Sequence, residues 1–518
     1  MCSSDLKYMK KILNRLLSRM VITCFLVVVQ LAIMILGVVF LQDRYIYISG
    51  ALKLLSVIVV MYLITKDTNP MVKMAWMVPI LIFPVLGGLM YVLYGHVLIP
   101  KKLRKNFLRV LQQEVYENVK GDNWVPAENL KSEPTYRICN YMENVAEAPL
   151  YKHTSVKYYA IGDDVMDDLI RDLESAEKYI FMEYFIVDKG YMWDTILEIL
   201  KRKAAEGLDV RFMYDDIGSV FNVPKYYWKE LESYGIKCMA FNQVVPFFAT
   251  IFNNRDHRKI TVIDGKIAHT GGYNMADEYI NKIEKYGKWK DSGVRLEGEG
   301  AWSFTVMFLQ MWNSFRYSEG SYNNYRPAEI DYSGVSDGYV QPYKSSPLSG
   351  ENVGENLYMQ MINDAQEYIY IFTPYLIVCN ELMLALKLAA KRGVDVRIVT
   401  PAIPDKKYIY KMTQFSYKEL LLAGVKIYQY TPGFIHSKTL LMDGKLASVG
   451  SINLDNRSFY HHFECGTLLY DCKAIEDVKK DMMDTFAESE EIDIPWCRNN
   501  ISRVNILGAI LRLLSPLL

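Results

Sequence analysis

The chain has 518 residues, enough for more than one domain with a hydrophobic core of its own. Its 59 basic and 59 acidic residues give a formal net charge of zero, so no global field attracts nucleic acid to it. The eight cysteines show neither CxxC nor zinc-finger spacing, which argues against a structural zinc site and a secreted disulfide framework. We expect free, mostly buried thiols on a reducing side of a membrane.

Three long apolar segments occupy the first 100 residues. Residues 20–42 and 74–100 contain no Asp, Glu, Lys or Arg, and residues 45–65 contain only Lys53 among the charged types. A helix of about 20 apolar residues can cross the hydrocarbon core of a bilayer. A cleaved signal peptide fits poorly, because the first segment is too long and two more follow it. The sequence therefore predicts a multi-pass protein of the cell membrane, with two or three hydrophobic helices in this region.

Basic residues cluster before the first apolar segment and after the third. Positive charge favours the cytoplasmic side, and three full crossings cannot place both clusters there. One segment, 45–65 or 74–100, is therefore expected to be re-entrant or interfacial, and the catalytic part to be cytoplasmic. The clustered residues are Lys7, Lys10, Lys11, Arg15 and Arg19, then Lys101, Lys102, Arg104, Lys105 and Arg109.

From about residue 150, short apolar strands alternate with helical stretches and Gly-containing turns, a pattern typical of α/β proteins. This pattern occurs twice, and the similar blocks keep their order along the chain. An ordered repeat predicts two homologous α/β lobes, with mixed β-sheets flanked by helices, that form one pseudo-two-fold unit. The matching blocks are 176–187 with 365–378, 204–214 with 389–400, 234–241 with 423–430, and 257–274 with 436–453.

These features divide the chain into consecutive parts. The tail has apolar residues at helical spacing and is expected to lie at the membrane interface or to dock on the lobes. The apolar stretch at 244–252 either contacts acyl chains or forms an ordinary buried strand. The expected parts are a basic N-terminus (1–19), a membrane region (20–100), a linker (101–150), a first lobe (151–330), a second lobe (331–500) and an amphipathic tail (501–518).

One motif appears at equivalent points of both lobes: His, any residue, Lys, any four residues, Asp, Gly. Each copy predicts two strands around an Asp-Gly turn. In the first copy, His257 and Lys259 lie two residues apart and share a strand face, whereas Asp264 has the other parity and belongs to the turn. The second copy has His436, Lys438 and Asp443.

A polar elbow follows each hairpin, GGYN at 271–274 and GSIN at 450–453. Small residues there, including Ser451, let backbone amides and the side chains of Asn274 and Asn453 approach a ligand. Imidazole, ammonium, amide and backbone N–H groups together suit a phosphate. For a single motif a buried core histidine would be the simpler interpretation, but two copies at equivalent points of a duplication favour a functional site.

The doubled HxKxxxxDG motif, followed by GGxN and GSxN, resembles the phospholipase D superfamily. Further segments resemble bacterial cardiolipin synthases, so that the resemblance covers essentially the whole chain except the first apolar segment. These segments are NPMVKMAW (69–76), PVLGGLMYVLYG (84–95), NNRDHRK (253–259), GFIHSK (433–438) and SPLL (515–518).

The resemblance implies two lobes that close on one shared active site, with no metal and no other cofactor. It implies transfer of a phosphatidyl group from one phosphatidylglycerol to another, which gives cardiolipin and glycerol. One His would form a phosphatidyl-histidine, and the other would act as acid and then base. We assign His257 as nucleophile and His436 as acid/base, and pseudo-symmetry leaves the reverse open. The residues that would hold the phosphate are Lys259, Lys438, Asn274 and Asn453.

Carboxylates are expected to orient the two imidazoles. Glu464, in HHFECG, resembles the acidic residue with this role in the family, and Asp291, in KWKDSG, is its counterpart in the first lobe. Each could instead be a surface or strand-end carboxylate. Asp264 and Asp443 belong to the family motif and so to the candidate catalytic set, although strand parity favours a turn-holding role for both.

Other interpretations stay open at this point. A phospholipase D would use water as acceptor and release phosphatidic acid, and phosphatidylethanolamine could replace the second phosphatidylglycerol. A nuclease is disfavoured by the neutral charge, and a non-catalytic lipid-binding scaffold by two intact motifs. His461 and His462 are not expected to bind a metal as a pair, because adjacent strand residues face opposite ways. The oligomeric state is not specified by the sequence.

Overall fold

A computed structural model of the chain describes the greater part of both expected lobes and part of the N-terminal region. The expected first apolar segment up to residue 41, the stretch at 244–252 and the tail from residue 502 lie outside the described residues. The residues that the structure describes are 42–66, 70–83, 87–88, 90–91, 105–110, 123–131, 133, 135–243, 254–316, 322–327, 332, 334–335 and 338–501.

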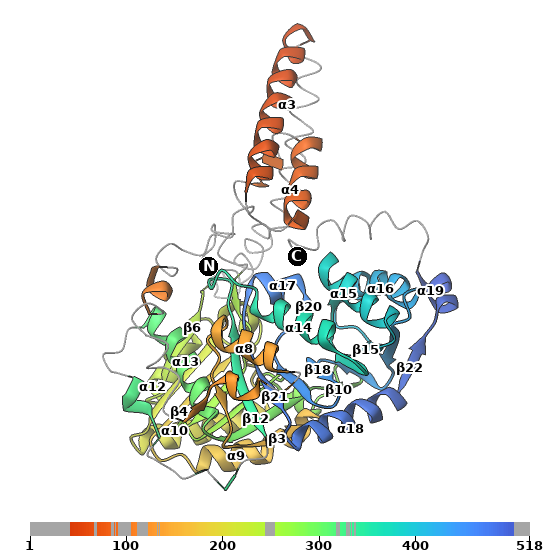
Figure 1. Ribbon diagram of the computed structural model, residues 1–518. Coiled ribbons are helices and arrows are strands. Elements are labelled where there is room, and N and C mark those ends of the chain that lie inside the picture. Colours follow the sequence, from red (N-terminus) through yellow and green to blue (C-terminus); the bar gives the residue numbers. More distant parts are fainter. Residues whose placement is uncertain are drawn as a thin grey trace. The chain divides into compact units, whose positions relative to one another are not determined.

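The chain divides into two compact units, and the larger one contains both lobes. The first lobe is built on a mixed sheet with the order β3-β11-β9-β8-β4-β5-β6 (Figure 1). Strands β4, β5 and β6 run parallel, and the remaining neighbours are antiparallel. The strands are β3 (Thr154–Tyr159), β4 (Tyr179–Tyr184), β5 (Asp209–Asp215), β6 (Lys237–Phe241), β8 (Ile260–Ile263), β9 (Ile267–Gly271) and β11 (Gly293–Gly298).

The second lobe repeats this sheet with the order β12-β21-β19-β18-β13-β15-β16, extended at one edge by β22. The parallel and antiparallel pairs recur at the same places as in the first lobe. The expected duplication into two α/β lobes is therefore confirmed. The strands are β12 (Tyr339–Ser345), β13 (Tyr368–Phe372), β15 (Asp395–Pro401), β16 (Lys426–Tyr430), β18 (Thr439–Met442), β19 (Leu446–Gly450), β21 (His462–Tyr470) and β22 (Ser489–Ile492).

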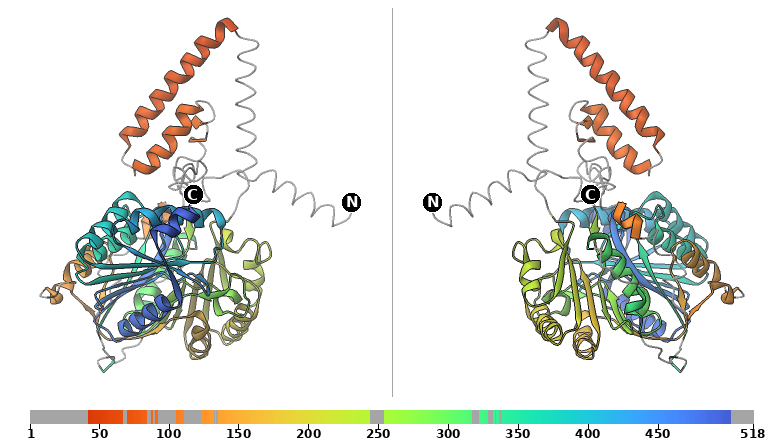
Figure 2. Two further views of the ribbon diagram at one scale, coloured as in Figure 1. Left: turned by 90° about the vertical axis from the view of Figure 1, so that its right-hand side faces the viewer. Right: turned by 90° about the vertical axis from the view of Figure 1, so that its left-hand side faces the viewer.

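Helices surround the two sheets, and the strands of both lobes lie together in the middle of this unit (Figure 2). In the first lobe the helices are α9 (Val165–Glu174), α10 (Tyr191–Ala205), α11 (Asp216–Ser219), α12 (Tyr227–Ser233) and α13 (Ala301–Phe315). In the second they are α14 (Val353–Asp364), α15 (Asn380–Lys391), α16 (Lys407–Leu421), α17 (Asn456–Tyr460), α18 (Ala474–Ala487) and α19 (Ile494–Asn500).

One hydrophobic core joins the two lobes. It contains Phe181 of β4, Phe308 of α13 and Leu441 of β18, all with no exposed surface. Helix α13 is apolar around most of its circumference, as expected for a helix that packs on several sides. The lobes are thus held as one body by apolar burial.

Two short parallel strand pairs also tie the lobes together. Strand β7 (Arg255–Asp256) of the first lobe pairs with the start of β21 in the second. Strand β10 (Lys288–Lys290) of the first lobe pairs with β17 (Gly433–Ile435) of the second. The strand that leads into each His-Lys motif is therefore paired with the other lobe.

Part of the expected linker is integrated into the second lobe. Strand β1 (Trp124–Val125) pairs with β2 (Leu150–Tyr151), and β2 pairs with β12. Helix α8 (Tyr136–Asn144) lies between these two strands in the sequence. All cysteines of the described residues are free and buried, as expected.

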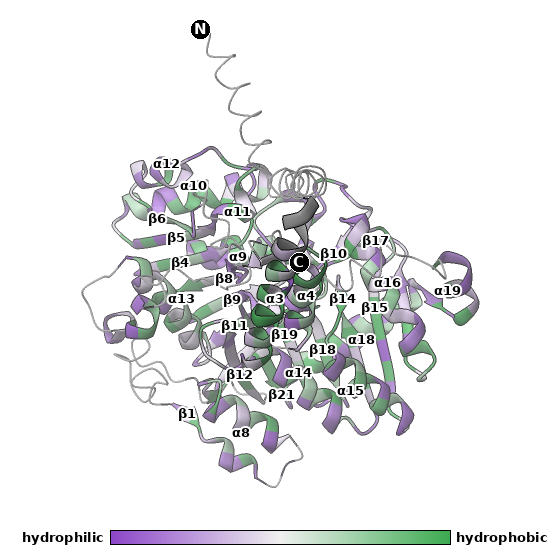
Figure 3. Cartoon of the chain, turned by 90° about the horizontal axis from the view of Figure 1, so that it is seen from above, coloured by the Kyte–Doolittle hydropathy of each residue, from purple (hydrophilic) through white to green (hydrophobic). Residues whose placement is uncertain are grey.

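The smaller unit contains α3 (Gln42–Thr65) and α4 (Pro70–Ile82), which are strongly hydrophobic (Figure 3). Trp76 of α4 packs edge-on against Tyr91, with ring centroids 5.6 Å apart, and Lys66 donates a hydrogen bond to the Tyr91 hydroxyl. Among the helices of the described residues, none is both long and apolar enough to span a membrane.

Candidate active site

The Asp of the first motif lies at a hairpin turn between β8 and β9. Asp264 has a φ of 52° and precedes Gly265 with a φ of 67°, a left-handed conformation that Asp and Gly tolerate. The Asp264 carboxylate accepts hydrogen bonds of 2.7–2.8 Å from the backbone N–H groups of Glu177, Lys178 and Tyr179. It thus connects the turn to the start of β4.

The second motif repeats this arrangement between β18 and β19. Asp443 has a φ of 51°, and its carboxylate accepts hydrogen bonds of 2.8 Å from the backbone N–H groups of Gln366, Glu367 and Tyr368. These bonds direct the carboxylate at the backbone and away from the imidazoles. The structure therefore places both Asp residues in the hairpin scaffold.

The two His-Lys pairs lie just before the hairpins. Strands β8 and β18 begin one residue after Lys259 and Lys438, so both pairs sit in the segment that leads into the strand and not within it. In each pair the Lys ammonium donates a hydrogen bond to the backbone carbonyl of the His, at His257 and at His436. All four side chains are buried.

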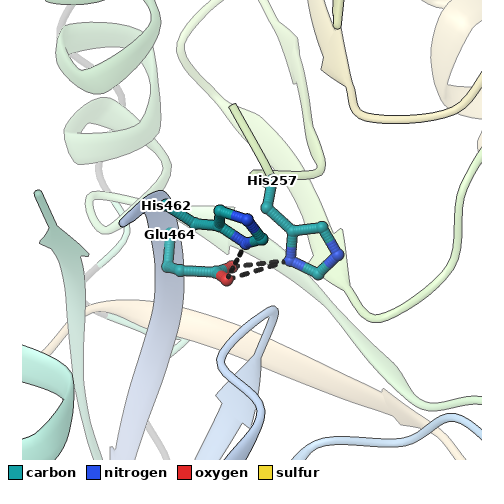
Figure 4. Close-up of side chains that lie close together, drawn as sticks. All are labelled: His257, His462 and Glu464. Atoms are coloured by element: carbon teal, nitrogen blue, oxygen red, sulfur yellow. Dashed lines mark hydrogen bonds and ion pairs between the residues drawn. The ribbon is translucent and has the colours of Figure 1, made fainter. Parts of the chain in front are cut away.

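Each histidine is held by a carboxylate of the other lobe. His257 Nδ1 lies 2.9 Å from Glu464 Oε2, and His436 Nδ1 lies 2.6 Å from Asp291 Oδ2 (Figure 4 shows the first pair). The backbone repeats this exchange, because the N–H of His257 donates to the Phe463 carbonyl at 2.9 Å and the N–H of His436 to that of Lys290 at 2.7 Å. The structure thus brings both expected carboxylates to the histidines, in a crossed arrangement.

The two elbows differ in how they support these carboxylates. Ser451 donates a hydrogen bond to Glu464 Oε2 and accepts one from the backbone N–H of Cys465 at 3.0 Å. The corresponding residue of the first lobe is Gly272, where an added Cβ would lie 2.0 Å from Asp291 Oδ1. The Asp291 carboxylate therefore packs against the backbone of Gly272, whereas the Glu464 carboxylate accepts a hydrogen bond from the Ser451 hydroxyl.

The two elbow asparagines also differ. Asn274 accepts a hydrogen bond from the backbone N–H of Ile186 at 3.0 Å and donates one to the Tyr279 hydroxyl at 2.7 Å. Tyr279 in turn packs edge-on against the His436 ring. The Asn453 side-chain oxygen is buried and has no hydrogen-bond partner among the described residues. Asn274 thus braces the site, whereas Asn453 retains polar capacity for a ligand.

The buried site disfavours positive charge when it is empty. Burial lowers the pKa of His257 well below its ordinary value and that of His436 to about 4. Burial also lowers the pKa of Lys259 to about 8 and that of Lys438 to about 7. The lysine charges lower the pKa of both imidazoles further, so both rings are neutral near pH 7. An anion would relieve this repulsion.

A family model described as "Cardiolipin synthase, PLD-like domain" matches residues 169–287 and 358–485, once in each lobe. A cardiolipin synthase of Halalkalibacterium halodurans is 32% identical over 91% of this chain and 95% of its own length. The chain belongs to the cardiolipin synthase family. A second family model, described as "Phospholipase_D-nuclease N-terminal", matches residues 54–95.

Two further proteins resemble this cardiolipin synthase family member. An uncharacterized protein of Streptococcus mutans serotype c is 42% identical over 89% of this chain and 99% of its own length. The solved phosphatidylserine synthase of Haemophilus influenzae Rd KW20 has a TM-score of 0.55 and 15% identity, and covers 74% of this chain and 99% of that chain. This likeness shows a shared fold.

Two buried ion pairs that the sequence pattern did not indicate flank His257. Arg255 is held by Asp215 at the end of β5, with nitrogen-oxygen distances of 2.8–3.0 Å. Arg258 binds Glu183 of β4. The only signal was a pair of arginines around the motif histidine and a carboxylate within each of two apolar strands. These pairs fix the approach to His257 against the first sheet.

We expect Asp264→Asn to lower the stability of the fold more than the catalytic activity. The amide loses the charge and one acceptor oxygen of a carboxylate that binds three backbone N–H groups, and this should lower the free energy of unfolding by about 1.5–3 kcal/mol. The midpoint of thermal unfolding in detergent measures the effect, with the exposed Glu177→Gln as control. A loss of activity above about 100-fold in still-folded Asp264→Asn would instead indicate a chemical role.

Proposed function

We propose that this phosphatidyltransferase joins two molecules of phosphatidylglycerol into cardiolipin and releases glycerol, through a phosphatidyl-histidine intermediate. The observation that carries this proposal is the pair of histidines whose Nδ1 atoms are held by carboxylates. Each imidazole then keeps Nε2 free for the reacting phosphate. The named relative, which matches nearly the full chain, supports the choice of substrate class.

The first step forms the covalent intermediate. The Nδ1–H of His257 donates a hydrogen bond to Glu464, and the lone pair on Nε2 attacks the phosphorus of the first phosphatidylglycerol. The new N–P bond replaces the bond from phosphorus to the glycerol oxygen. Protonated His436 gives its Nε2 proton to that oxygen, and free glycerol leaves.

In the second step His436 acts as a base and His257 is the group that leaves the same phosphorus. Neutral His436 takes the proton from a hydroxyl group of the second phosphatidylglycerol, whose oxygen attacks the phosphorus. The N–P bond breaks, cardiolipin is released, and His257 returns to its neutral form. The reaction therefore needs one imidazole as nucleophile and a separate one as acid and base, which is a reason for two motifs.

The remaining site residues would bind and orient the phosphate. We assign the ammonium groups of Lys259 and Lys438 to its non-bridging oxygens, where they stabilise charge that builds up in the transition state. Asn453, whose side-chain oxygen has no partner among the described residues, would contact a phosphate oxygen through its amide N–H group, because phosphate oxygens accept hydrogen bonds. Asn274 and Ser451 would act by holding Tyr279 and Glu464.

The enzyme acts on membrane lipids, and we place it at the cell membrane. Apolar side chains on α3, such as Leu54, Ile58 and Met61, are more than half exposed, which suits a lipid environment. As part of this proposal we keep the multi-pass arrangement expected for residues 20–100, with cytoplasmic lobes. Membership in a lipid-synthesising family and the apolar segments of the sequence support it.

An activated substrate separates the roles of the two histidines. A phosphatidyl ester of p-nitrophenol needs no acid, so His436→Ala should release about one p-nitrophenol per enzyme in a burst and retain a phosphatidyl adduct. His257→Ala should show neither the burst nor the adduct in an intact mass spectrum. With phosphatidylglycerol, we expect each variant to lose at least about 100-fold of activity. If His257→Ala showed the burst and His436→Ala did not, His436 would be the nucleophile and His257 the acid/base.

The products from phosphatidylglycerol alone test the proposed reaction. We expect the purified full chain in mixed micelles to form cardiolipin and glycerol in equal amounts, measured by mass spectrometry of the lipids and an assay of glycerol. Both His→Ala variants serve as controls for background synthesis. Phosphatidic acid without cardiolipin would identify the protein as a phospholipase D with water as acceptor.

Binding of a phosphodiester should weaken as the pH rises above about 7. Burial lowers the pKa of Lys438 to about 7, so the empty site loses this cation above that pH and must take up a proton to bind an anion. Linkage limits the loss of affinity to about tenfold per pH unit for each proton. The competitive inhibition constant of glycerophosphoglycerol measures it, since its own charge stays constant. Lys438→Arg should remove the additional loss of affinity that begins at about pH 7, and an unchanged slope above that pH would exclude Lys438.

A further inference from the structure

His462 is a buried histidine that the proposed reaction does not use. It begins β21, two residues before Glu464, and more than nine-tenths of its side chain is buried. Neither ring nitrogen has a hydrogen-bond partner among the described residues. Its ring lies against that of His257, with centroids 5.4 Å apart, and its Nδ1 is 3.6 Å from Glu464 Oε1 (Figure 4).

The other half of the site shows that packing alone does not require a histidine here. Through the paired strands, Trp289 occupies in β10 the position that His462 occupies in β21. Trp289 packs on His436 at a centroid distance of 5.5 Å, much as His462 packs on His257. An indole can donate a hydrogen bond but cannot bind a metal ion, whereas an imidazole can do both. Only the His257 half therefore carries an additional ligand group.

The three side chains meet with a geometry that suits a transition-metal ion. One ligand atom from each of His257, His462 and Glu464 lies within 4.8 Å of the others, and all three residues are buried. A tetrahedral Zn²⁺ with ligands at about 2.0–2.2 Å requires ligand atoms about 3.4 Å apart. The distances from Glu464 Oε1 to Nδ1 of His257 and to Nδ1 of His462 are 3.0 and 3.6 Å, which bracket this value. Two imidazoles, one carboxylate and an open fourth position are a common zinc set.

We propose that His257, His462 and Glu464 bind Zn²⁺ and that the bound ion reversibly blocks phosphatidyl transfer. This inference rests on the proposed function, because it concerns the imidazole that reacts with phosphorus. The ion is an inhibitor in this proposal and takes no part in the reaction, so the expectation of a cofactor-free enzyme is kept.

Coordination would block the reaction through the tautomer of His257. The metal needs the lone pair of Nδ1, which in the active form carries the proton donated to Glu464. Once Nδ1 binds zinc, the neutral ring must carry its proton on Nε2, and the lone pair that attacks phosphorus is lost. Zinc would also bind the Glu464 carboxylate, which otherwise stabilises the positive charge on the His257 imidazole after its attack on phosphorus. Nearby Lys259 and Lys438 repel the cation, so we expect binding that a chelator can reverse.

The test uses the purified full chain in detergent micelles, with Zn²⁺ as ligand. Calorimetric titration should show one ion per chain, and the same titration should stop cardiolipin formation until a chelator restores it. His462→Phe keeps the ring contact and removes the ligand atoms, so it should retain transfer and weaken zinc inhibition about tenfold or more. His461→Asn removes the neighbouring histidine and should leave inhibition unchanged.

Several outcomes would overturn the proposal. They are equal inhibition of wild type and His462→Phe, no zinc bound by the wild type, or loss of transfer when a chelator is added to the enzyme as isolated. If His462→Phe does not fold, X-ray absorption of the zinc-bound wild type decides: two imidazole nitrogens support the site, and cysteine sulfur excludes it. A protein that binds zinc here but makes no cardiolipin contradicts only the proposed function.

Discussion

The site depends on hydrogen bonds that cross between the lobes. His257 of the first lobe is oriented by Glu464 of the second, and His436 of the second by Asp291 of the first. The backbone makes the same exchange through the pairs β7–β21 and β10–β17. Neither lobe alone contains a motif histidine together with the carboxylate that orients it. A gene duplication therefore gains its chemistry only when the two copies pack on each other, and the shared apolar core maintains that packing.

The pseudo-symmetry of the two half-sites is imperfect around the imidazoles. Here Asp291 packs against Gly272, whereas Glu464 takes a hydrogen bond from Ser451. Trp289 covers one imidazole and His462 the other. These paired differences leave the backbone symmetric and give the two histidines different neighbours.

The sequence predicted what depends on local pattern and on repetition. The ordered blocks gave the two lobes, and the Asp-Gly signal assigned Asp264 to the turn. The parity argument assumed that His257 and Lys259 lie in the strand, whereas both precede β8. What the sequence could not predict depends on contacts between distant segments. Nothing local to Glu464 indicates that its partner is the histidine of the other motif.

The same limit explains the missed residues. Strand alternation was applied to the neighbours His461 and His462, but β21 begins only at His462, and no local pattern could place His462 beside a histidine of the other lobe. The ion pair of Asp215 with Arg255 forms only when β5 and the segment before the motif meet. Residues 124–150 were assigned to the expected linker because short edge strands have little periodicity, and the pairing of β1 with β2 and of β2 with β12 defines them.

Charge balance explains how an acid with so low a pKa can work. In the empty site the cations Lys259 and Lys438 are offset by Asp291 and Glu464, and neutral imidazoles complete a set with no net charge. A phosphodiester adds one negative charge to this buried, low-dielectric space, where an unbalanced charge is costly. Burial lowers the pKa of His436 to about 4, and the negative charge of a phosphodiester favours the protonated form of that imidazole. In the proposed reaction, this charge therefore helps His436 to hold the proton that it gives to the glycerol oxygen.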